Sequence, residues 1–127
     1  RDPARFAAIR QSMEIHDAMV QSLAAGDYEA LGEMATRYWR LRCTLDPGAT
    51  SPSLQQLFES DRLVEVSTGG LITGAGGGGF ALLVARHGRG DQLRSRLGEL
   101  TADPVFARSR VVPYELDSRG VQLLEQG

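Results

Sequence analysis

Lysine is absent from this chain, in which all 14 basic residues are arginine. The chain therefore has no phosphate-loop lysine, no Schiff-base former and no lysine that acts as a general base. Its one cysteine, Cys43, excludes an intrachain disulfide and suits a reducing compartment. No apolar run approaches the roughly 20 residues that span a membrane, and no signal peptide is visible. These absences predict a cytoplasmic protein with no membrane partner.

The length of the chain limits the number of domains it can form, and its net charge limits the kinds of partner it can bind. With 127 residues, of which 42% are hydrophobic, the chain can form one domain with a real core. Its net charge of -2 gives little attraction to phosphate backbones, so we expect no nucleic-acid partner. The chain opens with Arg1-Asp2-Pro3 and without methionine. We therefore expect a single domain, residues 1–127, cut from a longer protein.

Helical periodicity marks the first part of the chain. Apolar residues recur at helical spacing through residues 6–23, and Gly26 and Asp27 then indicate a helix stop and the cap of a second helix. The pattern resumes over Tyr28–Leu45, and the short connection predicts an antiparallel helical hairpin. The apolar residues that predict the first helix are Phe6, Ile9, Met13, Val20 and Leu23.

A turn and a third helix follow. Residues 46–48, Asp-Pro-Gly, are a turn signal. Ser51 and Pro52 predict the cap and the first residue of a helix that ends near Asp61. The predicted buried face of this helix consists of Leu54, Leu57 and Phe58.

A strand and a fourth helix are predicted next. Phe80–Ala85 is a short, continuous apolar run, which predicts a buried strand rather than a helix. Asp91 is expected to cap the helix that follows. That helix carries Leu93, Leu97 and Leu100.

Two strands are predicted at the end of the chain. One covers residues 111–116, where Pro113 indicates an edge or an end, and the other covers residues 121–124. The glycine run at 69–79 lies between two apolar stretches, so a strand is expected on each side of it. The predicted order is therefore three helices, two strands, one helix and two strands. This order predicts an α+β fold in which helices cover one face of a mostly antiparallel sheet.

The most informative segment is residues 69–79, in which seven of eleven residues are glycine. Such a run lets backbone N–H groups converge on an anion such as phosphate, and Thr73 can add a hydroxyl donor. A P-loop is excluded, because the run ends in Gly-Phe rather than in Gly-Lys followed by Ser or Thr. Gly74, Gly76 and Gly79 match the dinucleotide spacing G-x-G-x-x-G, but that site needs a helix directly after the loop and the sequence predicts a strand.

A flexible hairpin without a ligand is the structural alternative for the glycine run. Each glycine inside a strand or helix destabilises it by roughly 0.5–1 kcal/mol relative to alanine. The four consecutive glycines at 76–79 therefore indicate a close approach of the backbone to a ligand or to another part of the protein.

Residues 73–80, Thr-Gly-Ala-Gly-Gly-Gly-Gly-Phe, resemble the third conserved motif of the GHMP kinases, a superfamily of small-molecule kinases. The order of predicted elements is similar to their C-terminal domain, which has a ferredoxin-like α+β fold. Residues 38–42 and 45–52 resemble the sugar-kinase branch. The closest likeness is to L-fucokinases and the kinase part of bifunctional fucokinase/fucose-1-phosphate guanylyltransferases, with heptose-phosphate kinases as neighbours. The resemblance covers about residues 31–112.

This resemblance implies transfer of the γ-phosphoryl group of ATP to a sugar hydroxyl, with Mg2+, by a full-length enzyme. It implies that the turn lies at a domain interface and positions the substrate and the phosphate-binding loop of the other domain. Leu71 departs from the family, since many relatives carry lysine or arginine at that position. The positioning residues carried over are Thr73, Gly74, Ala75, Gly76, Gly77, Gly78 and Gly79.

Two parts of such a kinase are missing from the chain: the ATP-phosphate loop and the N-terminal domain that supplies the catalytic aspartate. Phosphoryl transfer needs positioned phosphates and a bridging metal ion. We therefore expect no catalytic residue, metal site, bound cofactor or turnover in this chain alone. The implied partners are an N-terminal kinase domain, a sugar, and a second copy through the exposed domain interface.

Other residues receive structural predictions. The position of Trp39 on its helix predicts a residue packed in the core. Stacking on a sugar is the more specific alternative. His16 on a helix and His87 in a turn lack metal-ligand partners at the right spacing, so neither is assigned to a metal or to catalysis. Cys43 is expected to be a buried small residue, and Asp46 to serve the turn before Pro47, with a substrate contact as its alternative.

Arg37, Arg40 and Arg42 form a basic helix face. A solvated surface is the default reading of such a face, and contact with an anionic ligand is the alternative.

Two functions remain open at this point. The first is the C-terminal domain of a sugar kinase, and the second is a stand-alone, non-catalytic ligand-binding or regulatory α+β module. A domain separated from its partner should expose an apolar patch larger than the few hundred Å² usual for monomers.

Overall fold

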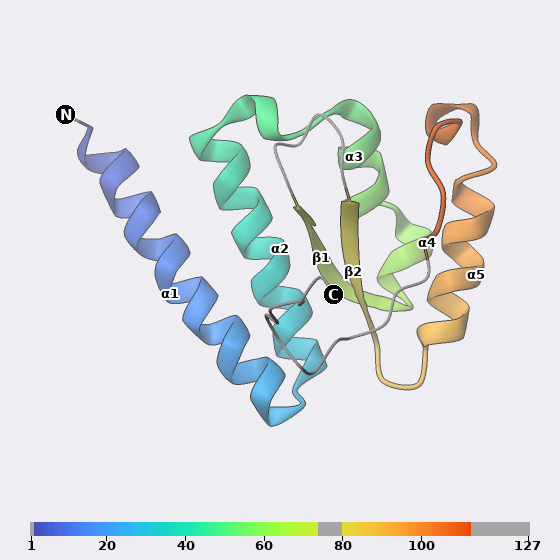
Figure 1. Cartoon of the computed structure of the whole chain (residues 1–127), viewed down its shortest axis with the longest axis horizontal. Coiled ribbons are helices and arrows are strands. Elements are labelled where there is room, and N and C mark those ends of the chain that lie inside the picture. The colour runs from blue at the N-terminus through green and yellow to red at the C-terminus, as the bar shows by residue number, and fades with distance from the viewer. Residues whose placement is uncertain (1, 74–79, 113–127) are drawn as a thin grey trace, which may run out of the picture.

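The computed structural model describes residues 2–73 and 80–112. Figure 1 shows two long helices side by side, a small sheet next to the second of them, and the remaining helices beyond the sheet. The elements in chain order are α1 (Pro3–Ala25), α2 (Tyr28–Leu45), η1 (Pro47–Ala49), α3 (Pro52–Phe58), α4 (Asp61–Val64), β1 (Ser67–Thr73), β2 (Phe80–Ala85), α5 (Gly90–Leu100) and η2 (Pro104–Phe106), where η marks a 3-10 turn. The predicted α+β class is confirmed.

The helical hairpin begins and ends at the predicted residues. Gly26 takes a left-handed φ of 70° after α1. Its N–H donates to the carbonyl oxygen of Leu23, and the N–H of Asp27 donates to that of Ser22, which satisfies the last turn of the helix. Asp27 caps α2, because its Oδ1 accepts a hydrogen bond from the N–H of Ala30 at 3.1 Å. These two neighbours turn the chain back on itself, so that α2 packs against α1.

The residues that predicted α1 do not face α2. Phe6, Ile9, Met13, Val20 and Leu23 are between 46% and 65% exposed. Ile15 is the buried residue of α1, at 6% exposure. The apolar periodicity therefore identified the helix correctly, but it marks a face that is not the one packed on α2.

The sheet has two described strands, β1 and β2, which pair antiparallel from Ser67 opposite Ala85 to Thr73 opposite Phe80. The strand predicted at Phe80–Ala85 is confirmed, and with it the objection to a dinucleotide loop, because no helix follows the glycines. The prediction that this strand is buried is wrong for its first half, where Phe80 is 64% exposed. The helices cover only the end of β2 near Leu83, which packs against the core.

The third helix starts as predicted and ends early. Ser51 accepts a hydrogen bond from the N–H of Leu54 at 3.3 Å and caps α3. The helix ends at Phe58 instead of near Asp61, and a separate short helix, α4, starts at Asp61. The predicted buried face of α3 is only half-buried, because the break lets Leu63 of α4 enter the core in its place.

Asp91 is not a helix cap, contrary to the sequence prediction. The cap position of α5 is Arg89, which makes no side-chain capping bond. Asp91 lies inside the first turn, where its Oδ1 is 3.4 Å from Nη1 of Arg94. A carboxylate in the first turn still interacts favourably with the helix dipole.

The core lies between the sheet, α4 and α5. Val66, at the entry to β1, has no exposed surface and packs with Leu63 and Leu93. The half-buried residues around this cluster are Leu57, Leu83, Ala85, Leu97 and Leu100. This cluster fixes the end of the hairpin that is remote from the glycine turn.

The two strands predicted near the end of the chain are not borne out within the described residues. Val111 and Val112 are described and are not in a strand. The rest of 111–116 and all of 121–124 lie outside the described residues.

Candidate functional site at the glycine turn

Residues 74–79, named here the glycine turn, follow β1 and precede β2 in the chain, and these two strands pair antiparallel (Figure 1). Thr73 is the last residue of β1 and Phe80 the first of β2. The hydroxyl of Thr73 donates a hydrogen bond to the carbonyl oxygen of Phe80 at 3.1 Å and closes the base of the turn. Both side chains are exposed, so this base is open to a ligand or another domain. Residues 74–79 lie outside the described residues.

Gly69 and Gly70 are explained by close packing inside the protein. Gly69 has a φ of 147°, and a Cβ there would meet the carbonyl oxygen of Gly32 and the hydroxyl of Thr36 on α2. A Cβ on Gly70 would meet the carbonyl oxygen of Leu82 on β2. Gly69 and Gly70 therefore serve packing within the protein, while the close approach predicted for the four glycines at 76–79 falls outside the described residues.

The glycines let α2 bond directly to β1. The hydroxyl of Thr36 accepts a hydrogen bond from the N–H of Gly70 at 3.2 Å. The hydroxyl of Thr68 donates to the carbonyl oxygen of Tyr28 at 3.1 Å. A strand held this close to a helix has little freedom to shift, so the turn at its end has a rigid support.

Arg42 extends this support to the base of the turn. Its Nη1 donates a hydrogen bond to the carbonyl oxygen of Ile72 at 3.2 Å, and its side chain is half-buried. Ile72 is buried, at 4% exposure, and directly precedes Thr73. The basic face predicted on α2 is therefore divided, because Arg37 and Arg40 are exposed and Arg42 points to β1.

Sequence reasoning missed this role of Arg42, although a signal was present. Arg42 follows Trp39 by three residues, and residues three apart lie on the same face of a helix. Trp39 is buried at 6% exposure, as predicted for a core residue. Its ring packs on Phe58 of α3, with ring centroids 4.6 Å apart. A side chain one turn beyond a buried tryptophan is placed to face the sheet.

Cys43 and Asp46 lie just beyond Arg42. Burial raises the pKa of the Cys43 thiol, and Asp46 also raises it, while the Thr50 side chain and the positive charge of Arg42 act in the opposite direction. Asp46 accepts a hydrogen bond from the N–H of Gly48 at 3.0 Å, which confirms its predicted turn role. The neutral thiol is favoured, so Cys43 is not activated as a nucleophile. The prediction that Cys43 is buried is not met, because the residue is only half-buried.

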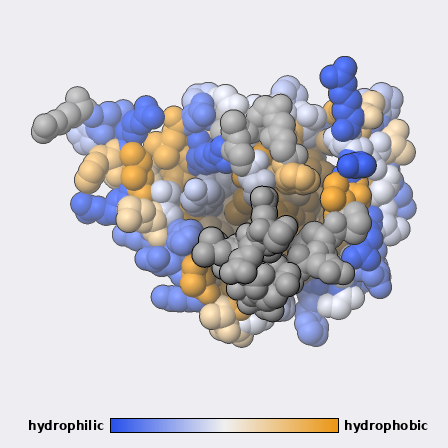
Figure 2. Space-filling view, viewed as in Figure 1, coloured by the Kyte–Doolittle hydropathy of each residue, from blue (hydrophilic) through white to orange (hydrophobic). Residues whose placement is uncertain are grey.

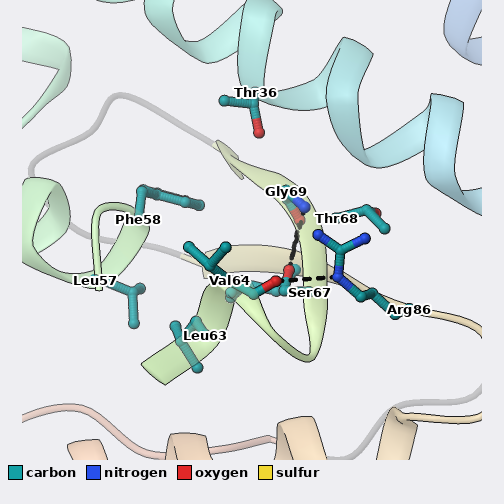
Figure 3. Close-up of a pocket in the computed structure, with 10 residues that line it drawn as sticks. Thr36, Leu57, Phe58, Leu63, Val64, Ser67, Thr68, Gly69 and Arg86 are labelled. Carbon is teal, nitrogen blue, oxygen red and sulfur yellow. Dashed lines mark hydrogen bonds between the residues drawn. The ribbon is translucent and has the colours of Figure 1, made fainter. Parts of the chain in front are cut away.

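A recess of about 180 Å³ lies at the other end of β1. Figure 3 shows Thr36 pointing its hydroxyl toward Gly69, with Ser67 and Arg86 close by. Arg86 is already bonded, through Nε to the carbonyl oxygen of Val64 at 3.0 Å and through Nη1 to a carboxylate on α2 at 2.9 Å. Residues 70–73 of β1, about 13 Å of strand, separate Gly69 in this recess from the turn. The recess is therefore not part of the site at the turn.

The described residues contain no group of three His, Cys, Asp or Glu side chains that could hold a metal ion. His16 lies exposed on α1 and His87 in the turn before α5, far from each other in the fold. None of the described helices is long and apolar enough to cross a membrane. What the described residues offer is the base of the glycine run, where Thr73 bonds to Phe80 and Arg42 bonds to the carbonyl oxygen of Ile72.

Comparison with known proteins identifies relatives with similar sequences. Residues 19–102 match the family model described as GHMP kinases C terminal. The chain is 31% identical over 100 residues to a protein of Arabidopsis thaliana named bifunctional fucokinase/GDP-fucose pyrophosphorylase. It is 26% identical over 106 residues to a protein of Bacteroides fragilis named L-fucokinase/L-fucose-1-P guanylyltransferase. No solved structure matches the chain.

These matches cover most of this chain and little of the relatives. They include 78% and 83% of the chain, but only 9% and 11% of the two relatives. The resemblance inferred from residues 73–80 and from the residues around Trp39 is confirmed at the level of the family and its fucokinase-like members.

Proposed function

Because this chain belongs to the GHMP kinase C-terminal family, we propose that it is the substrate-side domain of an ATP-dependent sugar kinase. The reaction is transfer of the γ-phosphoryl group of ATP to a sugar hydroxyl. L-fucose is the first candidate substrate, since both named relatives carry fucokinase in their names. The observation that carries the proposal is the hairpin that leads into the glycine run, because α2 bonds to its first strand through Arg42 and Thr36.

The proposed role of the turn is positioning. Backbone N–H groups in a glycine turn can converge on phosphate oxygens without a side chain in the way. Transfer of a phosphoryl group depends mainly on the alignment of nucleophile, phosphate and leaving oxygen, so a rigid support for such a turn contributes directly to the rate. The residues proposed for this role are Thr73, Gly74, Ala75, Gly76, Gly77, Gly78 and Gly79.

The chain is proposed to be inactive by itself. Nothing in its 127 residues corresponds to an ATP-phosphate loop, and there is no lysine to contact phosphates. The described residues do not fit a Mg2+ site, so no step of the reaction is assigned to a metal held by this chain. ATP and Mg2+ are proposed to bind a separate N-terminal kinase domain, with the sugar between the two. The location proposed for the enzyme is the cytoplasm.

The test is an assay of ATP consumption by the longer protein that carries this domain. The substrates are L-fucose, galactose and heptose phosphates, and the isolated 127-residue chain is assayed beside the longer protein. We expect turnover of one sugar by the longer protein and none by the chain. If the longer protein is inert with every sugar, or the gene encodes this domain alone, the non-catalytic binding module replaces the kinase. Turnover by the isolated chain would refute the proposed division of labour.

A further inference from the structure

The outer face of α1 carries a regular apolar seam. Six residues recur at alternating spacings of three and four, which is the a/d pattern of a helix that packs against another helix. They are Phe6, Ile9, Met13, His16, Val20 and Leu23, named here the α1 seam. Figure 2 shows apolar side chains among hydrophilic ones over this part of the surface.

Within the described residues the α1 seam is covered only in part. The guanidinium of Arg10 lies 5.5 Å from the ring centroid of Phe6, and Met13 and His16 line a recess with Tyr38 of α2. The five apolar members of the seam are 46% to 65% exposed, and the side chain of His16 is 66% exposed. They make up five of the twelve large hydrophobic residues found exposed. The helix packs on α2 through a different stripe, centred on Ile15. Four of the six seam residues also precede Met19, where the family match begins.

We propose that the α1 seam pairs antiparallel with the α1 seam of a second copy of this chain. The seam is self-complementary about the midpoint between Met13 and His16. An antiparallel pair places Phe6 against Leu23, Ile9 against Val20, and Met13 against His16, each layer occurring twice by two-fold symmetry. Such an isologous contact closes as a dimer.

Charges beside the seam select the antiparallel direction. Arg10 and Asp17 are exposed, and each directly follows a seam residue, Ile9 and His16, so both lie along the same edge of the seam. Asp17 also lines a recess with Tyr38 of α2. In an antiparallel pair Arg10 lies near Asp17 of the second copy, and the symmetric contact repeats this attraction. A parallel pair would instead bring Arg5 near Arg10 of the second copy, which repels.

The polar His16 inside the seam sets a limit on affinity. A polar residue at a core position lowers stability while it restricts register and direction. We therefore expect a dimer whose population depends on protein concentration, rather than a permanent one. His16→Leu should strengthen it.

The first test is sedimentation velocity of the 127-residue chain over a range of concentrations. The chain should shift from monomer to dimer as concentration rises. Val20→Glu should raise the dissociation constant about tenfold or more. Gln21→Glu adds the same charge at an exposed position outside the seam and should change it little. Circular dichroism and thermal unfolding of each variant show that the fold is kept.

Exchanging the charges of Arg10 and Asp17 distinguishes an antiparallel pair of helices from nonspecific association. Arg10→Glu and Asp17→Arg should each weaken the dimer, because each creates a like-charge contact in the antiparallel pair. The double variant should restore it. Loss of the dimer in the double variant would contradict the antiparallel arrangement.

Cross-linking gives an independent readout of direction. In a Cys43→Ser background, chains carrying Ile9→Cys are mixed with chains carrying Val20→Cys and oxidised. The proposal predicts mixed cross-links between the two variants, and few cross-links between identical variants. Cross-links between identical variants alone would indicate a parallel pair and overturn the proposal.

A chain that stays monomeric at millimolar concentration would also overturn it. Protection of the α1 seam only within the longer protein would overturn the proposal as well, because another part of that protein would then cover the seam. Each outcome concerns α1 alone, so it is independent of the proposed kinase function.

Discussion

The guanidinium of Arg42 on α2 donates a hydrogen bond to the carbonyl oxygen of Ile72 on β1, over 3.2 Å and across 30 residues of sequence. This bond fixes the strand one residue before Thr73 and the glycine turn. It places a half-buried cation at the end of the hairpin where the family resemblance locates the site.

Arg42→Ala should therefore affect the turn more than the fold. Losing a bond from a charged donor is expected to lower the free energy of unfolding by about 1–2 kcal/mol. In the longer kinase, displacement of the turn should lower kcat/KM by about tenfold to a hundredfold. Urea unfolding and steady-state kinetics measure the two effects.

The control for Arg42 is its neighbour Arg40→Ala. Arg40 is exposed, and an exposed substitution usually changes stability by no more than about 0.5 kcal/mol. Equal effects of the two substitutions on kcat/KM would show that Arg42 acts through general charge, not through its bond to the strand.

Gly69→Ala should strongly destabilise the domain. The backbone φ of 147° disfavours any side chain, and the new Cβ would meet Gly32 and Thr36 on α2. The expected loss is about 2–4 kcal/mol in the free energy of unfolding, from strain and overpacking together. Chemical denaturation of the isolated chain gives the value directly.

Gly98→Ala is the matched control for that substitution. Gly98 lies inside α5, and nothing is within 4 Å of a Cβ built there. Alanine is the better helix former, so stability should rise by about 0.5–1 kcal/mol. Similar effects of the two glycine substitutions would contradict the close contact between α2 and β1.

The two aspartates predicted as caps should behave differently. Asp27 accepts the capping bond of α2, and Asp27→Ala should cost about 1 kcal/mol of stability. Asp91 makes no capping bond and pairs only with exposed Arg94, so Asp91→Ala should change stability by about 0.5 kcal/mol or less. Thermal unfolding of both variants compares them, and a larger effect of Asp91 would argue against the observed start of α5.

The thiol of Cys43 should react slowly at neutral pH. Burial raises its pKa and thereby lowers the fraction of reactive thiolate. A raised folded-state pKa favours the neutral thiol, so any stability it contributes is present below the unfolded pKa and is lost as pH rises through the folded pKa. Labelling with a thiol reagent should accelerate in urea. Equal rates in the folded and unfolded chain would contradict the partial burial of Cys43.

Local signals in the sequence predicted the helical hairpin and the strand after the glycines. Gly26 and Asp27 define a helix end and a helix start by their own backbone and side-chain chemistry, which needs no tertiary context. The run Phe80–Ala85 was short enough to favour a strand, and it forms one. The family resemblance of the turn was visible for the same reason, since it lies in consecutive residues.

What the sequence did not reveal depends on contacts between distant residues. Arg42 reaches β1 only because Gly69 and Gly70 let the strand approach α2. The break between α3 and α4 that brings Leu63 into the core has no strong local signal. Periodicity showed that α1 is a helix, but could not show which face packs on α2.

The glycine turn itself gives the most direct test of the kinase account. The measurement is the L-fucose-dependent release of ADP by the longer protein, compared with a variant that carries Gly76→Val and Gly77→Val and with the Gly98→Ala control. We predict turnover by the unaltered protein and the control. The turn variant should lose about a hundredfold or more in kcat/KM while its unfolding temperature stays close to that of the parent. Full turnover by the turn variant would contradict the account.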